Sequence, residues 1–201
     1  MRARLPLAAL AIIGLATPAL AHSFLPEGGF YDRFIEGALV VLAYPATLLP
    51  LVAAGLLASL WHPDGLLRIW PVMIAGQAVG VGVAALVGTW VLPVMMGAGV
   101  TVATLAALLP SHSALIVYVA AAITGLLALA VSLEGHGLFE LPLAIHLGIF
   151  VAANVAVALG AGLPGATLEG NDKAWVRIAW RVAASWIAAV LVLYLAFTLA
   201  G

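Results

Sequence analysis

Long apolar stretches separated by short polar breaks dominate the pattern of this chain. A helix needs roughly 20 apolar residues to cross a bilayer core of about 30 Å. The segments between the stretches hold the glycine, proline and polar residues that are typical of turns. The pattern therefore predicts six membrane-spanning helices, at about residues 35–61, 69–90, 92–109, 113–132, 138–160 and 175–199.

The composition agrees with a lipid environment. Of the 201 residues, 66% are hydrophobic and only 7% are charged. A soluble domain of this length needs a substantially polar surface, so the surplus of apolar residues indicates a bilayer. The 21 glycines are typical of membrane helices that pack closely. We therefore expect an all-α integral membrane protein, a six-helix bundle that forms a single domain over residues 22–201.

Several classes of function are excluded by what the sequence lacks. The net charge is −1 and no basic stripe is present, so nucleic acid is not an expected partner. The chain has no cysteine, which excludes disulfides and thiolate metal sites. No phosphate-binding glycine loop or framed serine nucleophile occurs, and we expect neither an enzyme nor an ATP-driven step.

The first 21 residues resemble a secretory signal peptide. Arg2 and Arg4 precede an apolar run over residues 5–15, and the sequence TPALA then places Ala19 and Ala21 at the small positions of a cleavage site. Cleavage would leave His22 at the new N-terminus, where its amine and imidazole could chelate a metal together. The alternative is an uncleaved first helix.

Lysine and arginine predict the orientation of the spans. Arg68, Lys173, Arg177 and Arg181 flank the ends of spans one, three and five, whereas the other side holds only Arg33. Positive charges mark the cytoplasmic side of a membrane protein. We expect a bacterial-type inner (plasma) membrane protein with the mature N-terminus and the C-terminus outside, which agrees with the signal peptide.

Acidic residues concentrate at the predicted outer face. Glu140 lies about one helical turn beyond His136 in the segment LEGHGLFELP, residues 133–142. These side chains could meet Glu36 if spans one and five are neighbours, or the acids could act only as helix caps. Five of the eight acids fall here, namely Glu27, Asp32, Glu36, Glu134 and Glu140.

The first span contains two prolines, Pro45 and Pro50. Each removes a backbone hydrogen bond and tends to kink a helix. The freed carbonyls could form a midplane cation site, or the span could be merely a bent packing helix. Thr47, between the prolines, could donate a hydrogen bond to a freed carbonyl.

Polar side chains also occur inside other spans. His146 lies about two turns inside span five, and Asn154 follows on a similar face. An ionisable group within a span indicates function by default, although a histidine can also hydrogen-bond a neighbouring helix. Gln77 stands among Gly76, Gly80, Gly82 and Gly88, which predict a close-packing face on which Gln77 could simply join two helices.

Together, the ALA-His cleavage site, the six glycine-rich spans and the late GHG…ELP segment resemble the HupE/UreJ family. Its members are hydrogenase and urease accessory membrane proteins regarded as nickel or cobalt permeases. The family's first span has a pattern like F-x-H-G-x-x-H-P-x-x-G-x-D-H-L-L-A-M-x-A-x-G, with which FIEGALVVLAYPATLLPLVAAGL aligns without a gap. The matching positions are Phe34, Gly37, Leu48, Leu49, Ala53 and Gly55.

The metal-binding residues of that family pattern are replaced in this chain. Glu36 replaces the first histidine, and Ala46 and Thr47 replace the Asp-His pair. Val40, Val41 and Tyr44 replace the family's His-Pro and glycine. The later family motif H-G-x-E-x-P is approximated by His136, Gly137, Glu140 and Pro142, with one extra residue between. The resemblance thus implies a degenerate metal site, for which the candidate ligands are His22, Glu36, His136, Glu140 and His146.

Three functions are compatible with these features. The first is a HupE/UreJ-like permease for a divalent transition metal such as nickel, cobalt or copper. The second is a non-transporting accessory or scaffold subunit that has lost the metal site and binds a membrane protein partner or forms a homo-oligomer. The third is a small-solute permease that uses His146 and the Pro45/Pro50 break. No cofactor is expected beyond a bound divalent transition metal.

Overall fold

The computed structural model describes residues 28–108, 113–169 and 174–200. Every regular element in these ranges is helical, with seven α-helices and one short 3-10 helix, η1. Their bounds are α2 Phe30–Leu42, α3 Pro45–Trp61, α4 Gly65–Val83, η1 Ala84–Leu86, α5 Val91–Leu108, α6 Ala114–Ser132, α7 Leu143–Leu168 and α8 Ala174–Ala200. The predicted signal peptide and His22 lie outside the described residues.

The expected all-helical fold with apolar, membrane-length helices is confirmed. Helices α4 to α8 are each long and apolar enough to cross a bilayer. The first predicted span is instead two helices, α2 and α3, which meet at an angle of 74°. The pair supplies a sixth crossing if it passes through the membrane as one broken span.

The fifth predicted span is shifted along the chain. Helix α7 begins at Leu143, after Pro142 in an extended conformation, and continues through Pro164 to Leu168. His136 and Glu140 therefore lie in the turn before the helix, where the one-turn spacing expected on a shared helix face does not apply.

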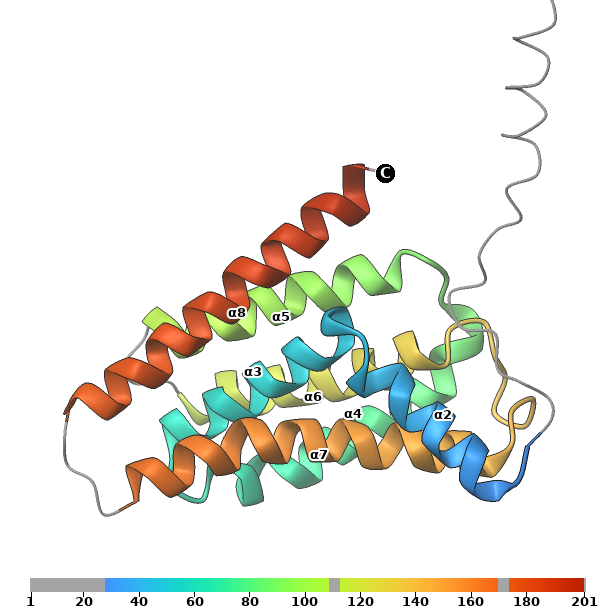
Figure 1. Cartoon of the computed structure of the whole chain (residues 1–201), viewed down its shortest axis with the longest axis horizontal. Helices are drawn as coiled ribbons and strands as arrows, with labels where there is room; N and C mark the ends of the chain where they lie inside the picture. Colours follow the sequence, from blue (N-terminus) through green and yellow to red (C-terminus); the bar gives the residue numbers. More distant parts are fainter. Residues whose placement is uncertain (1–27, 109–112, 170–173, 201) are drawn as a thin grey trace, which may run out of the picture.

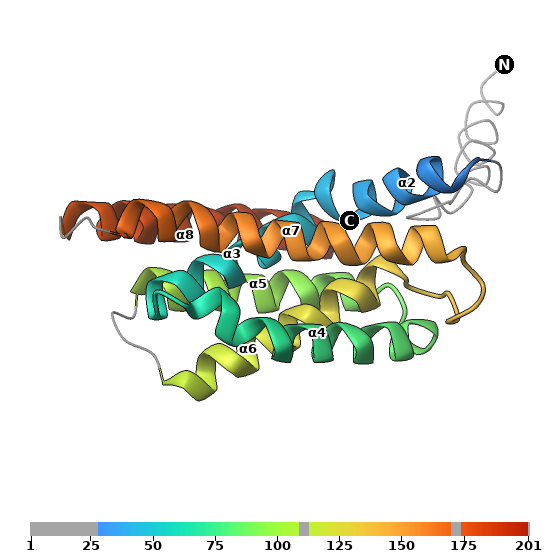
Figure 2. The same cartoon turned by 90° about the horizontal axis from the view of Figure 1, so that it is seen from below.

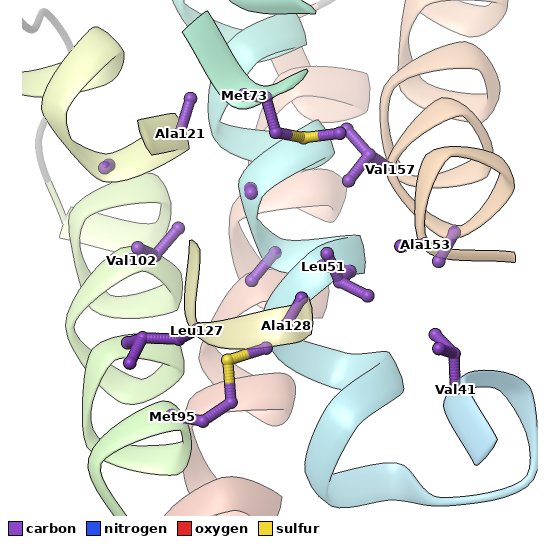
Figure 3. Close-up of a cluster of buried hydrophobic side chains, with 14 of the residues drawn as sticks. Val41, Leu51, Met73, Met95, Val102, Ala121, Leu127, Ala128, Ala153 and Val157 are labelled. Carbon is purple, nitrogen blue, oxygen red and sulfur yellow. The ribbon is translucent and has the colours of Figure 1, made fainter. Parts of the chain in front are cut away.

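Helix α3 occupies the centre of the bundle, where it contacts α5, α6, α7 and α8 (Figures 1 and 2). Helix α4 pairs with α6, α5 pairs with α8, and α2 lies against α7. The core around α3 is apolar: Leu51 lies among Met95 and Leu127 on one side and Val157 on the other (Figure 3). These four side chains are buried or nearly so, and they hold the centre of the bundle by close packing.

The first span and α7 approach each other so closely that glycine is required at the crossings. A Cβ atom added to any of four glycines would collide with a backbone carbonyl of the opposite helix. The four pairs are Gly37 with Ile145, Gly148 with Phe34, Gly55 with Val157, and Gly160 with Val52. Two crossings, one for each half of the broken span, therefore attach α2 and α3 to α7.

The predicted glycine face of α4 is confirmed in part. A Cβ at Gly76 would meet the carbonyl of Ala122, and one at Gly80 would meet that of Leu126, both on α6. Gly82 has nothing within 4 Å of such an atom and does not belong to this face. From α4 the contact thus uses the two glycines spaced four residues apart, and from α6 it uses Gly125, where a Cβ would meet the carbonyl of Met73.

A matched pair of alanine substitutions tests the crossing of α3 and α7. Gly55→Ala should lower the free energy of unfolding by about 1–3 kcal/mol, because the added methyl group overpacks the contact with Val157. Gly97→Ala in α5 is the control, because its Cβ meets nothing within 4 Å; it should be neutral or stabilising by up to about 1 kcal/mol. Reversible unfolding in mixed micelles measures both, and equal effects would contradict the close contact.

Candidate functional site

The first span breaks at Pro45, one of the two prolines at which the sequence predicts a kink. Pro45 is the first residue of α3, and Tyr44 before it has an extended backbone with φ −108° and ψ 114°. A residue that precedes proline is driven out of the helical region by the proline ring. In a continuous helix the carbonyl of Val41 would accept from residue 45, but proline has no N–H to donate. The break therefore leaves backbone oxygens of α2 without their helical donors.

The hydroxyl of Thr47 lies among the backbone oxygens at the break, two from α2 and one from Tyr44, which follows α2. Its Oγ1 is 3.0 Å from the carbonyl oxygen of Val41, 3.0 Å from that of Tyr44 and 3.3 Å from that of Val40. The Thr47 side chain is buried, with 2% of its surface exposed. The expectation that Thr47 donates to a carbonyl freed by the break is confirmed, and the structure adds that three carbonyls converge on one hydroxyl.

Pro50 has a different role, because α3 continues through it. A Cβ on Gly99 of α5 would lie 2.6 Å from Cγ of Pro50 and 2.9 Å from Cδ1 of Leu191 in α8. The glycine thus makes room for the proline ring and for the leucine at the same point. Pro50 is a packing residue between α3, α5 and α8 rather than part of the break.

The residues of the turn before α7, called the outer turn after its predicted side of the membrane, hydrogen-bond locally. The Glu140 carboxylate accepts from the backbone N–H of Gly137 at 2.8 Å. The Nδ1 atom of His136 lies 2.9 Å from the carbonyl oxygen of Glu134. A carbonyl can only accept, so Nδ1 of His136 carries the proton, and in the neutral ring Nε2 is the nitrogen with a lone pair.

The imidazole ring of His146 makes the same kind of hydrogen bond as that of His136. Its Nδ1 lies 3.2 Å from the carbonyl oxygen of Pro142, one turn earlier on α7. The ring lines a pocket of about 460 Å³ whose other walls are apolar and include Val81 of α4, Leu129 of α6 and Phe150 of α7. In the neutral ring Nε2 therefore carries the lone pair in an apolar surrounding.

The predicted metal ligands are not gathered in the described chain. Across residues 28–108, 113–169 and 174–200, no three histidine or acidic side chains are placed so that they could hold one metal ion. Glu36 is half-buried on α2, whereas His136 and Glu140 belong to the turn before α7. His22 lies outside the described residues, so its part in a site stays a prediction.

A buried polar network joins α4 to α7. The indole N–H of Trp70 donates to Oδ1 of Asn154 at 2.6 Å, and the Asn154 amide donates to Gln77 at 3.1 Å and to the carbonyl of Phe150 at 2.8 Å. Asn154 and His146 line two pockets that share Phe150, so they lie along one side of α7 as predicted. The interpretation of Gln77 as an interhelical link is confirmed.

Two arginines of α8 cap other helices, which the sequence analysis missed. Arg181 donates to the carbonyls of Ala107 at 2.7 Å and Leu108 at 3.2 Å, at the end of α5. Arg177 donates to the carbonyl of Leu60 at 3.0 Å, near the end of α3. A helix C-terminus has orphan carbonyls and a partial negative charge, which these cations neutralise. The signal in the sequence is the four-residue spacing of Arg177 and Arg181, which places both side chains on one face of a helix.

A polar pocket of about 500 Å³ adjoins Arg177 at this end of the bundle. Its lining includes Trp61, His62, Asp64 and Glu169. The backbone N–H of Asp64 donates to Nδ1 of His62 at 2.9 Å. That nitrogen therefore carries the lone pair rather than a proton, and the 3.9 Å approach of the Asp64 carboxylate to it is not an ion pair.

Comparisons with protein-family models, with curated proteins and with solved structures find no match for this chain. The resemblance to the HupE/UreJ family consequently rests on the sequence motifs alone and stays a prediction. The structure adds the geometry of the break at Pro45, of the turn before α7 and of the polar network between α4 and α7.

The caps on α5 can be tested by changing Arg181. Arg181→Ala should lower the free energy of unfolding by about 1.5–3 kcal/mol, the usual contribution of hydrogen bonds to a charged group. Arg181→Lys retains the charge near the helix end but loses the two-pronged donor, so its loss should be smaller. Arg68→Ala is the comparison, because Arg68 is exposed and its cation–π contact with Trp61, at 5.9 Å from the ring centre, should contribute only about 0.5–1 kcal/mol. A loss for Arg181→Ala no greater than that for Arg68→Ala would contradict the capping role.

Glu134, in the turn that follows α6, should make stability depend on pH. Burial raises the pKa of its carboxyl above the ordinary value, because the charged form is poorly solvated. The unfolded chain then releases this proton at lower pH than the folded protein, so stability falls as the pH rises through that window. Glu134→Gln should raise the thermal midpoint at a pH of about 7 but leave it unchanged at a pH of about 3, below the ordinary pKa of glutamate.

Scanning fluorimetry in detergent at the two pH values checks this difference. Glu169→Gln, which removes an exposed carboxylate at the other end of the bundle, controls for the change in net charge. An equal rise for both variants would show that burial of Glu134 is not the cause.

Proposed function

We propose that this chain is a membrane permease for a cation, HupE/UreJ-like in architecture, with a divalent transition metal as the first substrate to test. The broken first span against α7 carries the proposal, since its two halves meet at 74° and each half crosses α7 through glycine contacts. Discontinuous helices are a recurring way for transporters to place backbone oxygens at a substrate or ion site.

The chemistry of the outer turn supports a transition metal. His136 and His146 each have Nδ1 next to a backbone carbonyl, which leaves Nε2 as the lone-pair nitrogen of the neutral ring. A metal-bound histidine is typically held by a hydrogen bond of this kind through its other nitrogen. Glu140 adds a carboxylate to the same turn as His136, and imidazole with carboxylate suits nickel, cobalt and copper.

The distribution of charge supports the proposed orientation in a bacterial-type inner membrane. Arg68, Arg177 and Arg181 lie near the helix ends at Trp61 and Leu108, where the chain leaves the first and third spans. The cationic end is proposed to be cytoplasmic, with the start of α2, the turn of His136 and the C-terminus outside.

The second candidate is an accessory or scaffold subunit without transport. The separation of the predicted ligands favours it, because no three-residue metal site is present in the described ranges. Helix α8 is also largely exposed, with only Val176, Ala184 and Leu191 buried along its length. Such a subunit would copurify with a membrane protein partner and show no uptake.

Metal uptake by cells and by proteoliposomes that contain the purified full chain tests the first candidate. Radiolabelled nickel and cobalt should enter with the wild type. The double variant His136→Ala/Glu140→Ala should reduce apparent affinity by about tenfold or more, since even outer-shell partners of a metal ligand contribute 10–100-fold. Glu169→Ala, at the opposite end of the bundle, should transport as the wild type does.

Unchanged metal uptake in the double variant would show that His136 and Glu140 do not bind the transported metal. Absence of uptake by the wild type, together with a stable partner in mild detergent, would favour the scaffold. Loss of uptake of an organic solute but not of metal in His146→Ala would favour the small-solute permease, because His146 faces an apolar pocket.

A further inference from the structure

We propose that the break in the first span binds an alkali-metal cation. The ligands would be the backbone oxygens of Val40 and Val41, which lie 3.3 Å and 3.0 Å from the hydroxyl oxygen of Thr47, and that hydroxyl oxygen itself, whose proton is donated to the carbonyl of Tyr44. This site is separate from the outer turn and from the polar network between α4 and α7.

The oxygens at the break outnumber the hydrogens that could satisfy them. Thr47 has one hydroxyl proton and three carbonyl acceptors within reach, so it can donate to only one of them at a time. Pro45 removes the helical donor of Val41. The carbonyl of Tyr44 already accepts from the N–H groups of Thr47 and Leu48. The surplus of lone pairs is therefore greatest between Thr47, Val40 and Val41.

A positive ion would convert this surplus into favourable contacts. Buried oxygens that face one another without a hydrogen between them are destabilising, and a cation placed among them satisfies several lone pairs at once. Their spacing around Thr47 is that of neighbouring oxygens on a hard cation, whose ligands lie at about 2.3–2.6 Å.

The ligand set favours a monovalent ion. All three groups are neutral oxygens, and no carboxylate is among them. A buried divalent ion would need charged partners to offset its lost hydration, whereas rings of carbonyls alone hold alkali-metal ions in channel filters. The absence of nitrogen and sulfur from this set disfavours the transition metals proposed for the outer turn.

The site is close to the surface of the bundle. Leu42, Ala43 and Tyr44 are exposed at the outside of the bend, whereas Thr47 is buried just behind them. The inference does not rest on the proposed function, because a bound ion at this position requires no transport.

Thermal unfolding of the full chain in detergent tests the proposal at constant ionic strength. The midpoint should be roughly 2–4 °C higher in sodium chloride than in choline chloride, since an ion that binds only the folded state stabilises it. Lithium and potassium chloride identify which alkali ion fits best. Equal ionic strength removes general screening as the cause.

Three threonine variants locate the effect. Thr47→Val has nearly the same shape but no hydroxyl and should lose the sodium-dependent shift, whereas Thr47→Ser should keep most of it. Thr124→Val is the matched control, because Thr124 is a second fully buried threonine in α6, away from the break; it should keep the shift.

Pro45→Ala provides a second test if Thr47→Val does not fold. It restores an N–H that can satisfy the carbonyl of Val41 and leaves Thr47 unchanged, so the sodium-dependent shift should fall. The proposal is overturned if the wild type unfolds at one midpoint in all four salts, or if both Thr47→Val and Pro45→Ala respond to sodium as the wild type does.

Metal uptake distinguishes this site from the proposed permease. A sodium-dependent midpoint without nickel or cobalt uptake would support the ion site and contradict the permease. Uptake of nickel or cobalt, together with the same unfolding midpoint in all four salts, would support the permease and contradict the ion site.

Discussion

Where α2 and α3 cross α7, the helix backbones touch, and the rest of the bundle depends on that contact. Gly37 and Gly148 make the first crossing, and Gly55 and Gly160 make the second. In a bilayer, lipid tails are as apolar as leucine, so helices associate through close packing rather than through water exclusion. Two close crossings fix both halves of a bent span on one straight helix, and they hold α3 at the centre, where it contacts most of the other helices (Figure 1).

The same contact allows the break to exist. A bend of 74° leaves backbone oxygens without donors, which is tolerated at membrane depth only where protein or bound groups satisfy them. Here Thr47, on the turn after Pro45, supplies the hydroxyl. Pro50, only five residues later, causes no break: α3 continues through it, and its ring occupies the space over Gly99. Two prolines of one span thus have different consequences for the helix.

Much of this architecture was predictable, but the composition of the site was only partly so. The apolar runs predicted the helices, the two prolines a kink in the first span, and Thr47 a bond to a freed carbonyl. Gln77 was predicted as a link between helices and Asn154 only as a polar residue on the face of His146. Their mutual hydrogen bond and the donor Trp70 were not predicted, because periodicity does not show which faces meet. Arg177 and Arg181 were read only as indicators of orientation; their contacts with α3 and α5 join residues more than 70 positions apart.

By itself the sequence determined the lipid environment and the helical class, because both follow from the length of the hydrophobic runs. It also determined the positions at which helices could end or bend, because these follow from the covalent restrictions of proline and glycine. The tertiary structure alone decided which carbonyls converge on Thr47 and which candidate ligands stay apart. His136 and Glu140 are close along the chain yet belong to a turn in which each bonds its own backbone neighbour. Convergence on a common point depends on how rigid helices are placed relative to one another, and that placement results from the glycine crossings.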